Sequence, residues 1–204
     1  MNMELSDTQC QIKESVAKLL EQFDDQYWLE RDSSGEFPEE FCRAIADNGW
    51  MGIAMPEEYG GSGLGITEAA ILAQTITESG AGNAGFAAIV IGIFGLHPVV
   101  VFGTEEQKRK WLPPIIKRQD VACFAVTEPD AGLDTGNLTT QARLEGGHYV
   151  VRGRKIWTST AQVADRVMLL VRTGSRGTQS SSVDGLTLFY TRLDRDRISV
   201  REID

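Results

Sequence analysis

The sequence predicts an α+β protein in which an all-helical amino-terminal domain, residues 1–119, precedes a β domain, residues 120–204. Hydrophobic residues recur at helical spacing up to about residue 118, and beyond residue 120 they alternate along short runs separated by Gly, Asp and Ser. The charge pattern changes at the same place, because residues 1–119 hold 18 acidic and 9 basic side chains whereas residues 120–204 hold 11 of each. We expect the second domain to be an antiparallel sheet, barrel-like or a sandwich. We also expect it to be incomplete, since its last alternating run reaches the end of the sequence.

The first third of the chain predicts two helices and a glycine-rich loop. Ser6 suits a helix N-cap, and apolar residues follow it at helical spacing, so we expect a first helix over residues 7–27. Pro38 suits the first turn of a second helix, which should close at Gly49. Residues 50–65 hold too many glycines for a regular element, and we expect a tight connection there.

Three more helices are expected before the change of period. Thr67 should cap a helix over residues 68–78, and residues 83–102 are apolar nearly all round, which predicts burial on both sides. Thr104 then opens a last helix with a capping box, and the two prolines at 113–114 should interrupt or kink it.

The second domain is predicted from alternating runs, with a polar surface loop over residues 174–185. A short run at 121–126 precedes the others, which are residues 138–144, 149–156, 166–172, 186–193 and 198–203.

The clearest sign of a binding site is the loop that follows the run 121–126. It opens with Thr127, Glu128 and Pro129, and proline cannot donate a hydrogen bond to a sheet. Together with the glycines that follow, this predicts a structured loop at a strand end, with exposed backbone amides beside the Thr127 hydroxyl. Such a loop suits a planar polar ligand.

A second segment could complete that site. The run 148–156 ends in Trp157, Thr158 and Ser159, and an indole followed by hydroxyls could stack on a ring and bond its edge. Taken alone, Trp157 also fits a core or interface aromatic, and Ser159 also fits a turn hydroxyl. The residues by themselves leave both interpretations open.

Four strings occur in order over roughly residues 38 to 204: MPEEYGGSGLG, FGTEEQKRKWLPPI, TEPDAGLDT and GRKIWTS. With them the sequence resembles the acyl-CoA dehydrogenases, a family of flavoenzymes. The resemblance implies a helical domain followed by a β domain, with FAD lying against the β domain and an acyl-CoA thioester entering between the two.

The resemblance also implies residue roles. Val126 and Thr127 would bond the pyrimidine edge of the flavin, with Phe124 as the aromatic residue before them. Trp157 would pack beside the ring, and Ser159, where a Thr is commoner, would bond the N5 region.

Two further positions follow from the resemblance. Val90 and Phe94 would face the acyl chain. Leu133 stands where many members carry a Ser that reaches the cofactor phosphates or the CoA side, so that contact is not expected here.

The function implied is FAD-dependent α,β-dehydrogenation of an acyl-CoA to a 2-enoyl-CoA, with electron-transfer flavoprotein as acceptor and a homo-oligomer in the full-length protein. The family's catalytic base is a Glu on a second helical domain after the β domain. We therefore expect this sequence to be an amino-terminal fragment that has no catalytic residue of its own and is inactive alone. The alternatives are a non-catalytic flavin- or acyl-CoA-binding protein, and a flavin oxidase or monooxygenase on the same fold.

Composition narrows the function classes. A net charge of −9 without a basic stripe argues against nucleic acid as a partner. We expect no membrane span, because Gly92, Gly95, His97 and Pro98 interrupt the most apolar stretch. The three cysteines are far apart and the two histidines are isolated, so we expect no metal site and no disulfide. With no signal peptide visible, a cytoplasmic location is expected.

Overall fold

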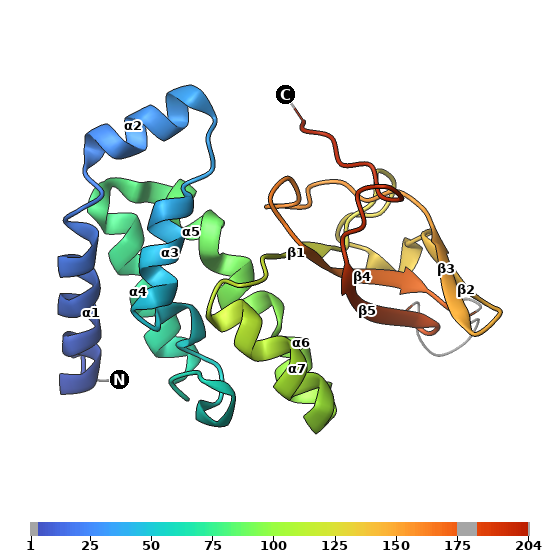
Figure 1. Ribbon diagram of the computed structural model, residues 1–204, viewed down its shortest axis with the longest axis horizontal. Coiled ribbons are helices and arrows are strands. Elements are labelled where there is room, and N and C mark those ends of the chain that lie inside the picture. The colour runs from blue at the N-terminus through green and yellow to red at the C-terminus, as the bar shows by residue number, and fades with distance from the viewer. Residues whose placement is uncertain (1–3, 175–182, 204) are drawn as a thin grey trace. The chain divides into compact units, whose positions relative to one another are not determined.

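The computed structural model describes residues 4–174 and 183–203, and the chain forms two compact units, Met1–Asp120 and Val121–Asp204 (Figure 1). The first unit is helical and the second is built on a sheet, which confirms the predicted α+β class. The last helix ends at Ile116 and the first strand begins at Ala122, so the change of element type falls where the hydrophobic period changes.

The first unit begins with α1 (Asp7–Leu20), α2 (Asp25–Ser34) and α3 (Glu39–Asp47). Ser6 caps α1 as predicted, with its hydroxyl accepting from the amide of Gln9. The single helix expected over residues 7–27 is wrong, because the Asp24 carboxylate accepts from the Tyr27 amide and starts a new helix there. Gly35, at φ 70°, then ends α2 in the left-handed conformation that glycine favours.

Short 3₁₀ turns η1 (Trp50–Gly52) and η2 (Glu57–Tyr59) lie in the glycine-rich connection, which is otherwise irregular as expected. The connection is tightly folded because a Cβ at Gly61 would overlap the Met55 carbonyl. It leads into α4 (Ile66–Ile76), whose N-cap is Gly65. The prediction that Thr67 caps this helix is therefore wrong; instead the Glu68 carboxylate accepts from the Gly65 amide at 3.0 Å.

The apolar segment predicted over residues 83–102 is helical but is not one uniform helix. Two π-helical turns, η3 (Thr77–Ala81) and η4 (Ile91–Gly95), flank α5 (Gly82–Val90), and α6 (His97–Phe102) follows. The last helix, α7 (Glu105–Ile116), has the predicted capping box at Thr104. The predicted interruption at Pro113 and Pro114 is wrong, because α7 runs through both, although neither has the N–H group that would donate to the carbonyl four residues before it.

A large apolar cluster packs the helices from α1 to α5 together. α1 packs along α4, and both α3 and α4 contact α5. Aromatic rings of Phe23, Trp28 and Phe41 meet edge to face at 5.1 to 5.5 Å around the first three helices. The helices are therefore fixed mainly by apolar burial rather than by their own propensity.

The helical stretch Ile66–Phe102 is long and apolar enough to cross a membrane, judged by length and composition alone. Gly92 and Gly95 lie within η4 and so do not interrupt it as expected, but a turn at Leu96 separates η4 from α6, and Gly80 at φ 96° breaks the helical backbone between α4 and α5. The stretch also bears core residues of the helical unit, among them Leu72, Ile76 and Ile89. Core helices of soluble proteins pass the same test, so the finding is weak support for a span.

The second unit contains one open, mixed sheet rather than an antiparallel barrel or sandwich. Its strands are β1 (Ala122–Ala125), β2 (Gln141–Glu145), β3 (His148–Arg152), β4 (Arg166–Arg172) and β5 (Leu186–Arg192). β2–β3 and β4–β5 are antiparallel pairs, whereas β1 and the start of β2 pair with β4 in parallel. Consecutive alternating runs do not reveal which strands pair in parallel, so the antiparallel prediction is corrected here.

Two other expectations fall in this unit. Residues 198–203 lie without strand structure, so the predicted last strand is wrong; none of the strands that the structure describes pairs with this segment. The polar loop expected at 174–185 lies largely outside the described residues. The core between the sheet and its loops is built mainly of small side chains; its members are Cys123, Ala125, Ala161, Ala164, Val167 and Leu193.

Candidate functional site

Two segments that are far apart in the sequence are joined beside β1, one contact lying just after its last residue and another at its first. The first follows β1 and begins at Thr127; the second follows β3 and runs through residues 156–160. The Ile156 amide donates to the Thr127 carbonyl at 2.9 Å. The Thr160 hydroxyl donates to the Ala122 carbonyl at 3.2 Å. The structure therefore brings together the two segments that the sequence singled out.

The first loop is ordered by its own hydrogen bonds. Glu128 and Ala131 exchange backbone hydrogen bonds at 3.0 and 3.1 Å. The Asp134 carboxylate accepts from the Gly136 amide at 3.0 Å, an Asx-type contact that fixes the turn before η5 (Thr135–Asn137). These contacts hold the loop as a defined surface at the strand end.

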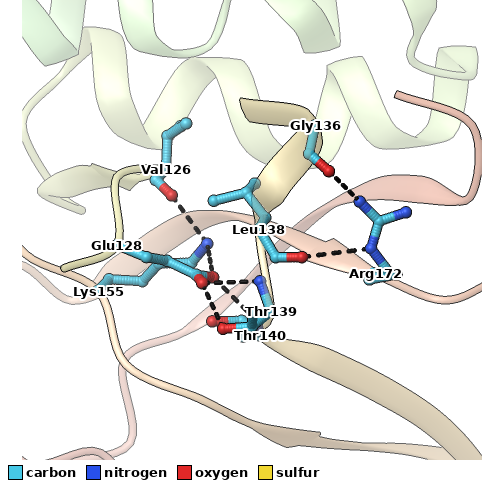
Figure 2. Close-up of polar contacts among 8 residues, drawn as sticks. All are labelled: Val126, Glu128, Gly136, Leu138, Thr139, Thr140, Lys155 and Arg172. Atoms are coloured by element: carbon cyan, nitrogen blue, oxygen red, sulfur yellow. Dashed lines mark hydrogen bonds and ion pairs between the residues drawn. The ribbon is translucent and has the colours of Figure 1, made fainter. Parts of the chain in front are cut away.

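A buried ion pair joins the two loops (Figure 2). Nζ of Lys155 lies 2.9 Å from Oε1 of Glu128 and donates to the Val126 carbonyl at 2.8 Å. The other Glu128 oxygen accepts from the amide and hydroxyl of Thr139, both at 2.7 Å, and Oε1 also accepts from the Thr140 amide at 2.9 Å. The Glu128 carboxylate therefore ties three chain segments to one point.

Burial and hydrogen bonding oppose each other at this pair. Burial by itself would raise the pKa of Glu128, but donors from Thr140, Thr139 and Lys155 outweigh it and lower that pKa to about 2. Burial lowers the pKa of Lys155, and the charge and hydrogen bond of Glu128 act in the opposite direction. Glu128 is thus a carboxylate held in its ionised form, which makes it a poor proton acceptor.

A neighbouring cation fastens the same loop from another direction. Arg172, at the end of β4, donates to the carbonyls of Leu138 and Gly136 at 3.2 and 2.8 Å (Figure 2). Its position follows from the sheet, because the Arg172 amide also donates to the Thr140 carbonyl at 2.8 Å.

The second loop presents Trp157 to the surface in an unusual backbone conformation. Trp157 has φ 57° and Thr160 has φ 63°, values that cost a side chain other than glycine about 1–2 kcal/mol each. The Trp157 side chain is nevertheless 67% exposed. An exposed indole held in a strained conformation is a feature of ligand sites rather than of cores.

The hydroxyls at the site are free to bind. Ser159 is exposed and Thr127 is half-buried, and within residues 4–174 and 183–203 neither side-chain hydroxyl makes a hydrogen bond. A flat ring with polar edges fits this set, because it needs an apolar face beside an indole and donors at its rim.

The remaining predicted residues divide between the two units. Phe124 lies in β1 and Val126 just after it, both half-buried and next to Thr127. Val90 ends α5 and Phe94 lies one π-helical turn further, both half-buried in the helical unit. Leu133 is fully exposed. The ligand contacts assigned to all these residues stay predictions.

The sequence interpretation missed the role of two residues. Glu128 was treated only as part of the loop, and Lys155 was not singled out. The available signal was one acidic and one basic residue inside the two motif strings: Glu128 directly follows Thr127, and Lys155 lies two residues before Trp157. Charge pairing across 27 positions could not be recognised without the fold.

The part of the chain that the structure describes gives no support for thiolate or metal chemistry. All three cysteines, Cys10, Cys42 and Cys123, are free thiols. Burial raises the pKa of Cys42 to about 12 and that of Cys123 to about 11, so neither is a ready thiolate. Among the described residues there is no cluster of three or more possible metal ligands.

The helical unit, the open mixed sheet and the joined loops define a two-domain α+β protein with its candidate ligand surface on the sheet domain. Residues 6–119 match the model of the acyl-CoA dehydrogenase N-terminal domain, and residues 123–204 match that of the acyl-CoA dehydrogenase middle domain. The chain therefore belongs to the acyl-CoA dehydrogenase family.

Relatives and solved structures agree with this assignment. The chain is 35% identical to 3-(aryl)acrylate reductase of Clostridium sporogenes over 83% of its own length and 44% of the relative's. It is 31% identical to mitochondrial isovaleryl-CoA dehydrogenase of Pongo abelii over 97% of its length and 48% of the relative's. A solved FAD complex of PigA superposes with a TM-score of 0.84 at 26% identity, covering 94% of this chain and 49% of that one. The chain thus spans about half the length of the relatives it matches.

Proposed function

We propose that this chain carries the FAD-binding surface of an acyl-CoA dehydrogenase that converts an acyl-CoA thioester to a 2-enoyl-CoA. The observation that supports this most directly is the joining of the two motif loops, by which Thr127, Trp157 and Ser159 come from segments fixed to each other. The FAD complex of PigA and the name of isovaleryl-CoA dehydrogenase supply the cofactor and the substrate class.

In this proposal, Thr127 and Val126 bind the polar edge of the flavin, Trp157 covers its ring and Ser159 donates near N5. FAD, when bound, supplies the acceptor for the hydride that leaves the substrate β-carbon. Donors placed at the ring edge stabilise the charge that reduction adds, and they need no rearrangement because their loops are already fixed. Phe124 completes the strand end that carries the first loop.

The proton acceptor is not found at this surface. The Glu128 carboxylate is engaged by four donor groups and its pKa is about 2, so it is a poor base. We propose that the chain by itself does not turn over acyl-CoA, and that the whole protein, with electron-transfer flavoprotein as acceptor and as a homo-oligomer, carries the activity.

The test uses the chain loaded with FAD under anaerobic conditions. Binding should appear as quenched flavin fluorescence, and saturated acyl-CoA thioesters of several lengths should leave the oxidised flavin band unbleached. Absence of FAD binding would remove the proposal. Bleaching at the rate of a complete family member would place a base within these residues.

A second candidate function is reduction of an acrylate, the reverse redox direction, because one relative at 35% identity is a 3-(aryl)acrylate reductase. The whole protein, with its FAD reduced chemically, would be mixed anaerobically with a 3-arylacrylate or a 2-enoyl-CoA. Faster reoxidation by the arylacrylate would favour this candidate, and faster reoxidation by the enoyl-CoA would favour the dehydrogenase.

A further inference from the structure

Lys155 occupies a central position between the candidate ligand residues without being one of them. Its ammonium lies beside the carbonyl of Val126 and the carboxylate of Glu128, which precede and follow Thr127. Trp157 and Ser159 lie two and four residues after it. The Lys155 side chain is only 9% exposed and that of Glu128 only 3%, so neither presents its charge to a ligand at the surface.

Stability alone is a weak explanation for this pair. Transferring two charges from water into a protein interior costs several kcal/mol per ion, and apolar residues of similar volume often serve stability equally well. What an apolar pair could not do is hold a backbone carbonyl and a carboxylate at fixed distances from one atom. The pair therefore supplies geometry that burial of apolar groups would not.

The strained backbone of the second loop also indicates that its geometry is held by surrounding contacts. Left-handed residues persist when the surrounding structure holds them there. Lys155 anchors the chain before Trp157, and the Thr160 hydroxyl anchors it to Ala122 afterwards. Arg195 extends the second anchor, donating to the carbonyls of residues 161, 162 and 164 at 2.7 to 3.1 Å. The segment 157–159 is thus held at both ends.

We propose that Lys155 is a positioning residue, which with Glu128 sets the distance between Thr127 on one loop and Trp157 and Ser159 on the other. This inference rests on the proposed function, in which those three residues bind one flavin ring. Lys155 touches neither cofactor nor substrate; it acts through the Val126 carbonyl and the Glu128 carboxylate.

The first test compares FAD binding by the chain with that of Lys155→Met, which keeps the apolar stem and removes the charge. We expect the Kd for FAD to rise about tenfold, the effect of misplacing about one hydrogen bond, and the flavin absorption bands to shift. Lys155→Arg, which keeps a cation, should recover part of the affinity. Arg154→Met is the matched control, because Arg154 is the exposed neighbour, and it should bind FAD unchanged.

Lys155→Met strands a buried carboxylate and could unfold the sheet unit, so a second variant is needed. Glu128→Gln/Lys155→Met leaves no charge behind, and the single amide oxygen of Gln can still accept either from the two Thr139 donors or from the Thr140 amide. If this variant folds and binds FAD with unchanged Kd and spectrum, the positioning role is overturned. Weaker binding with a shifted spectrum at full folding supports it.

A cofactor-free measurement separates this inference from the proposed function. With 5-fluorotryptophan in place of the four tryptophans, the Trp157 line in a ¹⁹F spectrum is assigned from Trp157→Phe. We expect the double variant to move or broaden that line while the lines of Trp28, Trp50 and Trp111 keep their positions. An unmoved Trp157 line would refute positioning even if the chain binds FAD; a moved line without FAD binding would refute only the proposed function.

Discussion

At the scale of single residues, the site contains side chains whose burial is unusual for their type or differs from that of the adjacent residues. Glu128 is a buried, ionised carboxylate, whereas Pro129 and Asp130 beside it are exposed. Trp157 is exposed where a tryptophan would ordinarily be covered. Both departures fall in the two loops that share the Lys155 contacts, so the unusual residues gather where the ligand is proposed to bind.

Glu128 should make stability depend on pH in the acid range. Its pKa in the folded protein is about 2, below the ordinary 4.5, so its contribution is present above about pH 4.5 and is lost as the pH falls toward 2. Glu128→Gln should lower the free energy of unfolding by about 3 kcal/mol at pH 7, and this difference should shrink across that window. Denaturant unfolding from pH 7 to 2 measures it. Asp130→Asn, at an exposed carboxylate in the same loop, is the control and should change the free energy of unfolding at pH 7 by less than about 0.5 kcal/mol.

Trp157→Gly should separate folding from binding. Glycine relieves the cost of φ 57° but adds backbone freedom to the unfolded chain, and the indole buries little surface, so these effects nearly cancel. We expect FAD-free stability to change by less than about 1 kcal/mol while FAD affinity falls. Thermal unfolding and fluorescence titration measure the two quantities. A large loss of stability with full affinity would make Trp157 a packing residue.

At the scale of elements, capping side chains close by in the sequence decide where a helix begins. They do not by themselves decide whether two helical segments join into one helix. The N-cap at Ser6 and the capping box at Thr104 lie where the sequence predicts them. The break between α1 and α2, however, depends on Asp24 competing as a new cap. Propensity alone would have allowed one helix there, and packing of Phe23 and Trp28 into one core decided otherwise.

Two threonines make this difference measurable. Thr104→Ala removes the hydroxyl that caps α7 and should cost about 1 kcal/mol. Thr67→Ala alters an exposed residue inside the first turn of α4, after the actual N-cap at Gly65, and should change stability by less than about 0.5 kcal/mol. Urea unfolding of both variants gives the comparison. Equal losses would mean that Thr67 caps α4 after all.

At the scale of the whole molecule, the apolar clusters of the helical unit and of the sheet unit differ in kind. The helical unit buries large side chains such as Phe41 and Ile45, whereas the sheet unit packs Cys123, Ala161 and Ala164 under its loops. Small residues allow loop backbone to lie close to the sheet, which suits a unit whose loops are the proposed binding surface. Large residues suit a unit whose role is packing.

A substitution in one core should destabilise mainly the unit that contains that core. Ile45→Ala in the helical unit and Leu193→Ala in the sheet unit both truncate buried core side chains, and each should cost about 2–5 kcal/mol. Native-state hydrogen exchange should show the larger loss of protection in the unit that carries the change. Equal losses throughout the chain for both variants would show one cooperative unit instead.

The sequence by itself determined the order of helices before strands, the loop after β1, the caps at Ser6 and Thr104 and the family. Each of these depends on residues close in the chain, such as the Ser6–Gln9 and Thr104–Gln107 pairs, or on short motif strings. Only the tertiary structure decided that β1 runs parallel to β4, that residues 198–203 form no strand, and that Lys155 joins Glu128. The physical reason is the distance in sequence between the interacting residues. A strand's partner and a buried charge's counter-ion are selected by contacts between distant segments. The alternation or charge of one segment carries no information about the other.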